Sequence, residues 1–282
     1  MNSLINERIF IQVPQVVPTI GYFSDEATLK EYNAMVDKDY NGLAALKPFT
    51  FDAKKREVVG SNIPAKTLLY QKFLKIASYE LSGLQKLEDA RAMHAINPSS
   101  GLSTEGYCYV DLGVVIRKKT ERTSRLLEQI EKRNPKMARL KAPVAILLHG
   151  LEPLVNGDNV DYRLTDNAVI YESPEFAGNN KSFSQVSNGR PVIQKKGTRT
   201  VWNNSALGVS GFYLDSGLSV VASGVDLASS YDGGRVVLHR GAAANAKIFD
   251  AYAQNQNGEL NQAKSELESR YAQSLKVLRG EK

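Results

Sequence analysis

The side chains best suited to metal binding or nucleophilic chemistry are few in this 282-residue chain. It contains three histidines, His94, His149 and His239, and one cysteine, Cys108. The histidines lack the HxxxH or HExxH spacing that would bring two imidazoles to one metal ion. A single cysteine cannot form a disulfide within the chain. We therefore expect structural histidines, a buried and inert thiol, and no bound metal or cofactor.

A serine, an aspartate and a histidine occur in the order of an α/β-hydrolase triad, at Ser210, Asp226 and His239. The segment ILLHG, which ends at Gly150, also resembles the His-Gly that follows a strand in that family. The nucleophile elbow requires G-x-S-x-G, however, and Phe212 replaces its second glycine. Too few residues separate Ser210 from His239 to hold the crossover helices of that fold. The sequence therefore predicts neither a hydrolase nor any other enzyme.

One segment, residues 117–141, has the composition of a polyanion-binding surface. It holds ten basic residues and three glutamates, a local charge of +7, whereas the whole chain carries +6. At about 100° per residue, Leu126, Leu127 and Ile130 share one side of a helix over 118–133. Basic residues occupy the exposed side, and Pro135 ends the helix before a short second helix or a turn. The candidate contact residues are Lys118, Arg122, Arg125, Lys132, Arg133, Lys136 and Arg139.

Three environments fit this basic segment. Lys and Arg side chains bind the phosphates of DNA or RNA whatever the base sequence. The same side chains can pair with an acidic surface of a neighbouring subunit, or they can face solvent. No Phe, Tyr or Trp occurs between Tyr109 and Tyr162, so the segment itself offers no platform for base stacking. The sequence therefore favours a subunit contact, with nucleic acid as the alternative.

The order of the predicted helices and strands along the chain indicates an α+β fold. The first residues alternate apolar and polar side chains around Pro14 and Pro18, which is typical of an extended arm or an edge strand. The predicted parts, which can form one continuous domain, are an extended arm at 1–20, a mainly helical portion at 21–141 with a strand at 107–116 and the basic helix at 117–134, a predominantly antiparallel β-rich portion at 142–241, and C-terminal amphipathic helices at 242–282.

Two helices are expected before the basic segment. One covers about 25–46, and the strongest in the sequence covers about 63–95 with a broad apolar arc. Glu80 falls within that arc, where an unpaired carboxylate would be costly, so a buried Lys or Arg partner is expected. The polar segment 176–190 is expected to be a mobile or partner-bound loop. The predicted β segments are a hairpin at 49–59 and strands at 144–149, 160–171, 192–194, 198–202, 208–215, 218–223 and 235–240.

The last predicted helix, at about 259–279, offers a second contact surface. Its apolar residues recur every three or four positions, close to the helical period of about 3.6, so they stay on one face. Such a face docks on the body or on another subunit. The candidate assembly residues are Leu260, Leu267, Tyr271, Leu275 and Leu278.

These features favour a non-enzymatic structural subunit of a larger complex, for example a virion component such as a head–tail connector or a tail protein. A homo-oligomer or larger protein assembly is the expected partner. The alternative is a DNA- or RNA-binding protein that acts through 117–141. The N-terminus lacks the pattern of a secretory signal, and the longest apolar run, Val144 to Leu148, is far shorter than a membrane span. We therefore expect a cytoplasmic protein, in some cases incorporated into a virion.

Overall fold

A computed structural model describes most of the chain between residues 20 and 240. The described residues are 20–76, 79–85, 87–88, 108–203, 208–222 and 227–240, together with 264, 268 and 271. Contacts divide the chain into a body, Met1–His239, and a second unit, Arg240–Lys282. Of the arm predicted at 1–20, Ile20 begins strand β1 (Ile20–Tyr22), and residues 1–19 lie outside the described residues. So do Leu260, Leu267, Leu275 and Leu278 of the predicted assembly helix, while Tyr271 is helical and exposed.

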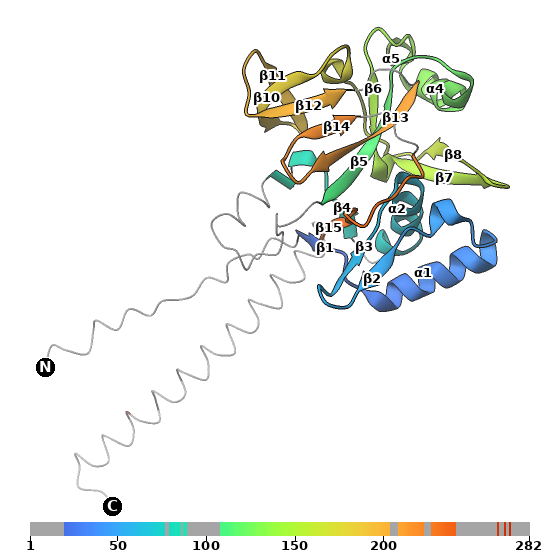
Figure 1. The fold of residues 1–282 in the computed structure, drawn as a ribbon, viewed down its shortest axis with the longest axis vertical. Helices are drawn as coiled ribbons and strands as arrows, with labels where there is room; N and C mark the ends of the chain where they lie inside the picture. The colour runs from blue at the N-terminus through green and yellow to red at the C-terminus, as the bar shows by residue number, and fades with distance from the viewer. Residues whose placement is uncertain are drawn as a thin grey trace, which may run out of the picture. The chain divides into compact units, whose positions relative to one another are not determined.

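The body is built on an eight-stranded sheet (Figure 1). Its strands are β5 Tyr109–Ile116, β6 Val144–Leu147, β9 Ile170–Glu172, β10 Lys181–Ser187, β11 Arg190–Gln194, β12 Arg199–Asn203, β13 Val209–Asp215 and β14 Val220–Ala222. Their order is β11-β10-β12-β14-β13-β5-β6-β9, and within this sheet only β12 and β14 pair in parallel. A mostly antiparallel sheet with separate helices confirms the predicted α+β class.

Strand β5 is buried at every position because the two hydrophobic clusters of the body lie on its opposite faces. Val114 and Ile116 belong to the cluster that also contains the helices, whereas Val115 between them belongs to the cluster with β10, β12 and β14. Val110 and Leu112 belong to that second cluster as well, because the register between β5 and β13 shifts between Asp111 and Gly113. A continuous apolar run of this kind is typical of a strand covered on both sides. The strand predicted at 107–116 is therefore present and central.

Three smaller pairings complete the β structure. β1 Ile20–Tyr22, β15 Val237–Arg240 and β4 Tyr79–Leu81 form a three-stranded sheet in the order β1-β15-β4. Two hairpins are formed by β2 Thr50–Asp52 with β3 Glu57–Val59, and by β7 Leu151–Asn156 with β8 Asn159–Leu164. The three-stranded sheet places residues near 80 beside residues near 239.

The first helix, α1 Glu26–Asp39, is shorter than predicted. The Asp25 carboxylate caps it by accepting the Ala27 N–H at 3.0 Å. Asn41 and Gly42 then adopt positive φ angles of 52° and 66°, a left-handed backbone that ends a helix. A separate 3-10 turn at Ala44–Leu46 covers the end of the predicted range.

The prediction of a long helix over 63–95 is wrong. α2 Ile63–Leu69 passes into a π-helical turn at Tyr70–Leu74, and the chain then enters β4. Ile76, placed on the buried arc by helical spacing, is 81% exposed because the helix has already ended. Glu80 consequently lies on a strand with an exposed side chain, and its partner is His239 instead of a buried Lys or Arg.

The prediction of a loop over 176–190 is also wrong. Strands β10 and β11 form a hairpin there, with Phe183 fully buried in the sheet cluster. Polar residues on the opposite face of β10 conceal the strand pattern.

The predicted strand at 160–171 is two separate strands, β8 and β9, while β7 was not predicted. Within the described residues, no helix is long and apolar enough to cross a membrane.

Candidate functional site

The predicted basic helix is present as α4 Glu121–Arg133, followed by the short helix α5 Pro135–Ala138. The Thr123 hydroxyl accepts the Thr120 N–H at 2.8 Å, which closes a capping box at the start of α4. Asn134 ends α4, and its side chain accepts the Lys136 N–H at 3.2 Å to begin α5. Leu126, Leu127 and Ile130 are buried in the core, as their spacing predicts.

The basic side chains of α4 and α5 lie on the surface. Arg125 forms an ion pair with Asp161, with 2.9 Å between Nη1 and Oδ2, and remains 61% exposed. The Arg133 guanidinium donates to the Leu164 carbonyl at 3.4 Å and is also exposed. The Arg122 side chain lies outside the described residues. The exposed residues that define what we call the basic surface are Lys118, Lys119, Arg125, Lys132, Arg133, Lys136, Arg139 and Lys141.

Arg117, the first cation of the basic segment, has a structural role instead. Its guanidinium donates to Ser210 Oγ at 2.5 Å and to Asn203 Oδ1 at 2.7 Å. Partial burial lowers its pKa to about 10. Arg117 therefore ties β13 and β12 together and is not part of the basic surface.

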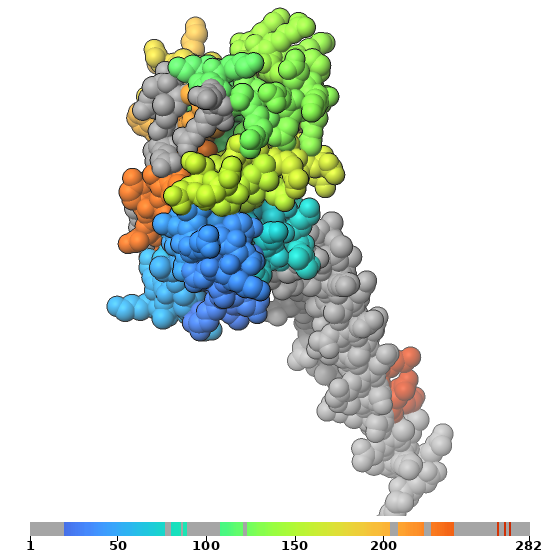
Figure 2. Space-filling model, turned by 90° about the vertical axis from the view of Figure 1, so that its right-hand side faces the viewer, coloured from blue at the N-terminus to red at the C-terminus, as the bar shows by residue number. Residues whose placement is uncertain are grey.

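Helix α1 presents charges of the opposite sign. Its N-cap and exposed face carry five acidic residues and two lysines: Asp25, Glu26, Glu31, Asp37, Asp39, Lys30 and Lys38. Lys30 pairs with Glu26 at 2.8 Å, and Lys47 pairs with Asp37 at 2.6 Å, whereas no ion pair of Glu31 or Asp39 is present among the described residues. Helices α4 and α5 lie at the top of the body and α1 at the bottom in Figures 1 and 2. The body therefore carries a basic surface and an acidic surface at opposite ends.

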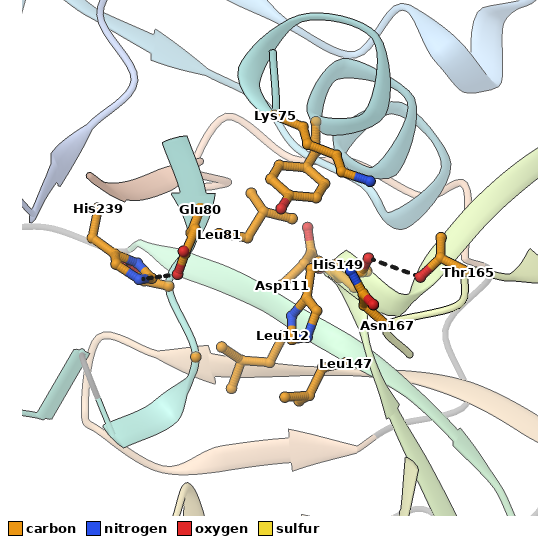
Figure 3. A pocket seen from close by; sticks show the side chains of 14 residues that line it. Lys75, Glu80, Leu81, Asp111, Leu112, Leu147, His149, Thr165, Asn167 and His239 are labelled. Atoms are coloured by element: carbon orange, nitrogen blue, oxygen red, sulfur yellow. Dashed lines mark hydrogen bonds and ion pairs between the residues drawn. The ribbon is translucent and has the colours of Figure 1, made fainter. Parts of the chain in front are cut away.

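A cavity of about 410 Å³ forms a second candidate site, one that sequence analysis missed (Figure 3). It is bordered by β4, β5, β15 and the turn after β6. Figure 3 shows Glu80 and His239 joined on one side, with His149, Thr165 and Asn167 on the other. Its lining residues are Tyr70, Lys75, Glu80, Leu81, Ser82, Gly83, Asp111, Leu112, Leu147, Leu148, His149, Thr165, Asn167 and His239.

Three polar side chains at this cavity form a hydrogen-bonded chain. His239 Nε2 lies 2.8 Å from Glu80 Oε2, and His239 Nδ1 lies 3.3 Å from Ser82 Oγ. The His239 side chain is 15% exposed, and that of Glu80 is 55% exposed. Ser82 is buried. The sequence shows none of this, because residues 80–82 and 239 meet only through the pairing of β4 with β15.

His149, at the turn after β6, faces the same cavity. Burial lowers the pKa of its imidazole, the nearby His239 lowers it further, and Glu80 opposes the shift. The ring is therefore neutral at pH 7, with one N–H donor and one acceptor nitrogen. No hydrogen bond to this ring is present in the described part of the chain. Glu80, expected to pair with a buried Lys or Arg, and His149 and His239, expected to be structural, thus line one cavity.

A buried lysine and a buried aspartate interact at the wall of the cavity, where Asp111 is one of the lining residues. Lys66 Nζ donates to the main-chain oxygen of Asp111 at 2.6 Å, and Ser61 Oγ donates to Asp111 Oδ2 at 2.6 Å. Burial lowers the pKa of Lys66 to about 8, partly offset by Asp111. Burial raises the pKa of Asp111, partly offset by Lys66 and the Ser61 hydroxyl. This pair joins α2 to β5 and so holds the wall of the cavity in place.

Metal binding receives no support from the described residues, since they contain no group of three His, Cys, Asp or Glu side chains placed to hold an ion. Cys108 is buried, as expected. His94 lies outside the described residues. No protein-family model, curated protein or solved structure matches this chain.

Proposed function

We propose that the chain is an assembly subunit that associates head to tail, with the basic surface of one copy against helix α1 of the next. The opposite charge of these two exposed regions, at opposite ends of the body, is the observation that supports the proposal. A contact between two different surfaces of identical chains is heterologous, and it produces rings or open chains. A virion component such as a connector or a tail protein is one concrete example.

The strength of such a contact is expected to be modest. Exposed ion pairs contribute about 0.2–1 kcal/mol each, and salt screens them. Charge complementarity mainly accelerates encounter and selects the orientation of the partners. Association should therefore depend on protein concentration and weaken as salt is added.

A protein partner fits the basic surface better than a nucleic acid does. Glu128 and Glu131 are exposed on the same helix, where they would repel phosphates but can pair with Lys30 or Lys38 of another copy. The segment also lacks aromatic side chains for base stacking. Nucleic acid is the second candidate, because eight exposed basic residues lie within 118–141.

Sedimentation velocity of the purified chain tests the proposal. We expect species heavier than the 31.1 kDa monomer at about 50 mM salt, and their loss at about 500 mM salt. The triple variant Lys132→Glu, Lys136→Glu and Arg139→Glu should remain monomeric at low salt. The control variant Lys54→Glu, Lys195→Glu and Lys196→Glu changes the net charge equally, at exposed sites elsewhere, and should associate normally.

Two results would contradict the proposal. One is a wild-type chain that is monomeric at every concentration and salt tested. The other is equal association by the two triple variants. If the wild-type monomer instead binds a fluorescent DNA or RNA with steep salt dependence, and the first variant does not, the nucleic-acid alternative replaces the assembly proposal.

A further inference from the structure

We propose that Ser82 is an activated nucleophile, with His239 as its general base, and that the cavity admits small carboxylic esters. Ser82 and His239 lie outside the two charged surfaces, so the proposed chemistry does not depend on head-to-tail association. It departs from the sequence-based expectation of a non-enzymatic chain. Its basis is the hydrogen-bonded order Ser82, His239, Glu80 at the edge of a cavity.

The carboxylate determines the tautomer of His239. A carboxylate can only accept hydrogen bonds, so the Nε2 atom, 2.8 Å from Glu80 Oε2, must carry a proton. In the neutral ring, Nδ1 then has a free electron pair directed at Ser82 Oγ, 3.3 Å away. Ser82 is thus the nucleophile, His239 the general base and Glu80 the carboxylate that orients the base, which is the arrangement that activates a serine hydroxyl. The two ring nitrogens exchange the roles that they have in chymotrypsin.

Paired strands hold these groups in register. The Ser82 N–H donates to the Val237 carbonyl at 3.1 Å, which connects β4 to β15 two residues before His239. Ile20 of β1 lies opposite His239 on the other side of β15. His239 lies on β15, and Ser82 directly follows β4 and is held by its main-chain bond to β15, so both are positioned more precisely than residues on free loops. Glu80 acts through His239 and is a positioning residue.

The cavity also contains groups that can stabilise an oxyanion. His149 is neutral at pH 7 and has one N–H that no described residue accepts. The ammonium group of Lys75 belongs to the same lining. Donors aimed at a developing negative charge are a large part of acyl-transfer catalysis. The main-chain N–H of Ser82 is excluded from this role because Val237 already accepts it.

The size and lining of the cavity define the substrate class. About 410 Å³ lies at the small end of the range for ligand pockets, so short esters fit and long peptides do not. Leu81, Leu112 and Leu147 provide an apolar wall for a short aliphatic or aryl acyl group (Figure 3). A charged, highly hydrated acyl group would lose its water against these leucines.

The reaction balances with water as the only co-reactant. Ser82 Oγ forms a bond to the ester carbonyl carbon while its proton moves to His239 Nδ1. The carbon–oxygen bond to the leaving alcohol breaks, and the alcohol departs with the proton from Nδ1. A water molecule then attacks the acyl-serine while His239 Nδ1 accepts its proton. The bond between the carbonyl carbon and Ser82 Oγ breaks, His239 returns the proton to Oγ, and a carboxylic acid is released.

Active-site labelling of the full chain tests the inference. We expect phenylmethylsulfonyl fluoride to add one sulfonyl group, located at Ser82 by peptide mass mapping. Because mapping uses the wild-type chain, this result does not depend on any variant folding. Ser82→Ala should lose the adduct, whereas the control Ser187→Ala, at an exposed site on β10, should keep it. His239→Gln, with an unchanged thermal transition, should be labelled at least about 100-fold more slowly.

Turnover provides a second readout. The wild-type chain should hydrolyse p-nitrophenyl acetate, and Ser82→Ala and His239→Gln should not exceed the rate in buffer. The inference is overturned if Ser82 carries no adduct, or if its labelling rate is the same in His239→Gln. Hydrolysis that persists in Ser82→Ala would overturn it as well, since another group would then be the nucleophile.

Discussion

Charged side chains of the body lie in two opposite environments, one exposed to solvent and one buried. On the basic surface, Lys132, Lys136 and Arg139 extend into solvent, where a charge is well hydrated and costs little. At the wall of the cavity, Lys66 and Asp111 are buried together, and burial shifts both pKa values towards the neutral forms. Exposed charged side chains can therefore bind other molecules, whereas buried ones interact only with groups inside the protein. Substitutions at the basic surface should therefore change association and leave stability nearly unchanged. Substitutions of the buried pair should lower stability.

The largest effect is expected for Asp111→Ala. This change removes the acceptor of the Ser61 hydroxyl and the carboxylate whose charge favours the protonated form of Lys66, so the buried ammonium loses that stabilisation. We expect the free energy of unfolding to fall by about 3–5 kcal/mol. Urea denaturation of both proteins measures the difference. Asp158→Ala, in the exposed turn between β7 and β8, is the control and should change it by less than about 0.5 kcal/mol.

The next effect is a pH dependence due to Lys66. Its pKa is about 8 in the folded protein against 10.5 in the unfolded chain, so the unfolded chain binds more protons between these values. Stability contributed by this group therefore rises with pH across that window. Between about pH 7.5 and pH 9.5, wild-type should gain about 2 kcal/mol relative to Lys66→Met. Equal pH profiles from urea denaturation would show that Lys66 does not titrate there.

The smallest effect on stability is expected at the basic surface. Lys132→Glu, Lys136→Glu and Arg139→Glu together should change the free energy of unfolding by less than about 1 kcal/mol, because none of these side chains is buried. Breaking one exposed ion pair with Arg125→Gln should cost about 0.2–1 kcal/mol. Thermal and urea transitions of both variants check this. A loss of several kcal/mol would mean that the surface belongs to the fold.

The two regions also differ in how far the sequence predicted them. Helix α4 was predicted because Leu126, Leu127 and Ile130 repeat with the helical period within 13 residues, and all three are buried. The basic surface then follows from the same period. Local patterns of this kind are readable because neighbours in sequence become neighbours in space.

The cavity could not be predicted, because distant segments form it. Glu80 and His239 are separated by 159 positions and meet through strands of three and four residues, which are too short to show a pattern. The apolar run before Glu80 also suggested a helix where the chain turns into β4. In the same way, Ser182 and Ser184 concealed the strand around Phe183. In both segments the secondary structure depends on pairing with strands elsewhere in the chain, which local spacing does not reveal.

A charge-swap mixing experiment determines whether the basic surface of one copy binds helix α1 of another. One variant carries Lys132→Glu, Lys136→Glu and Arg139→Glu on the basic surface, and the other carries Glu31→Lys and Asp39→Lys on α1. In sedimentation velocity at low salt, each variant alone should be monomeric. The first variant has no excess positive charge left on its basic surface, where five exposed cations face five carboxylates, and the second has no net negative charge left on α1, where four lysines face three carboxylates. An equimolar mixture should recover species heavier than the monomer, since an acidic surface of one variant again meets a basic surface of the other. If the mixture remains monomeric under conditions where wild-type associates, the basic surface and α1 are not partners.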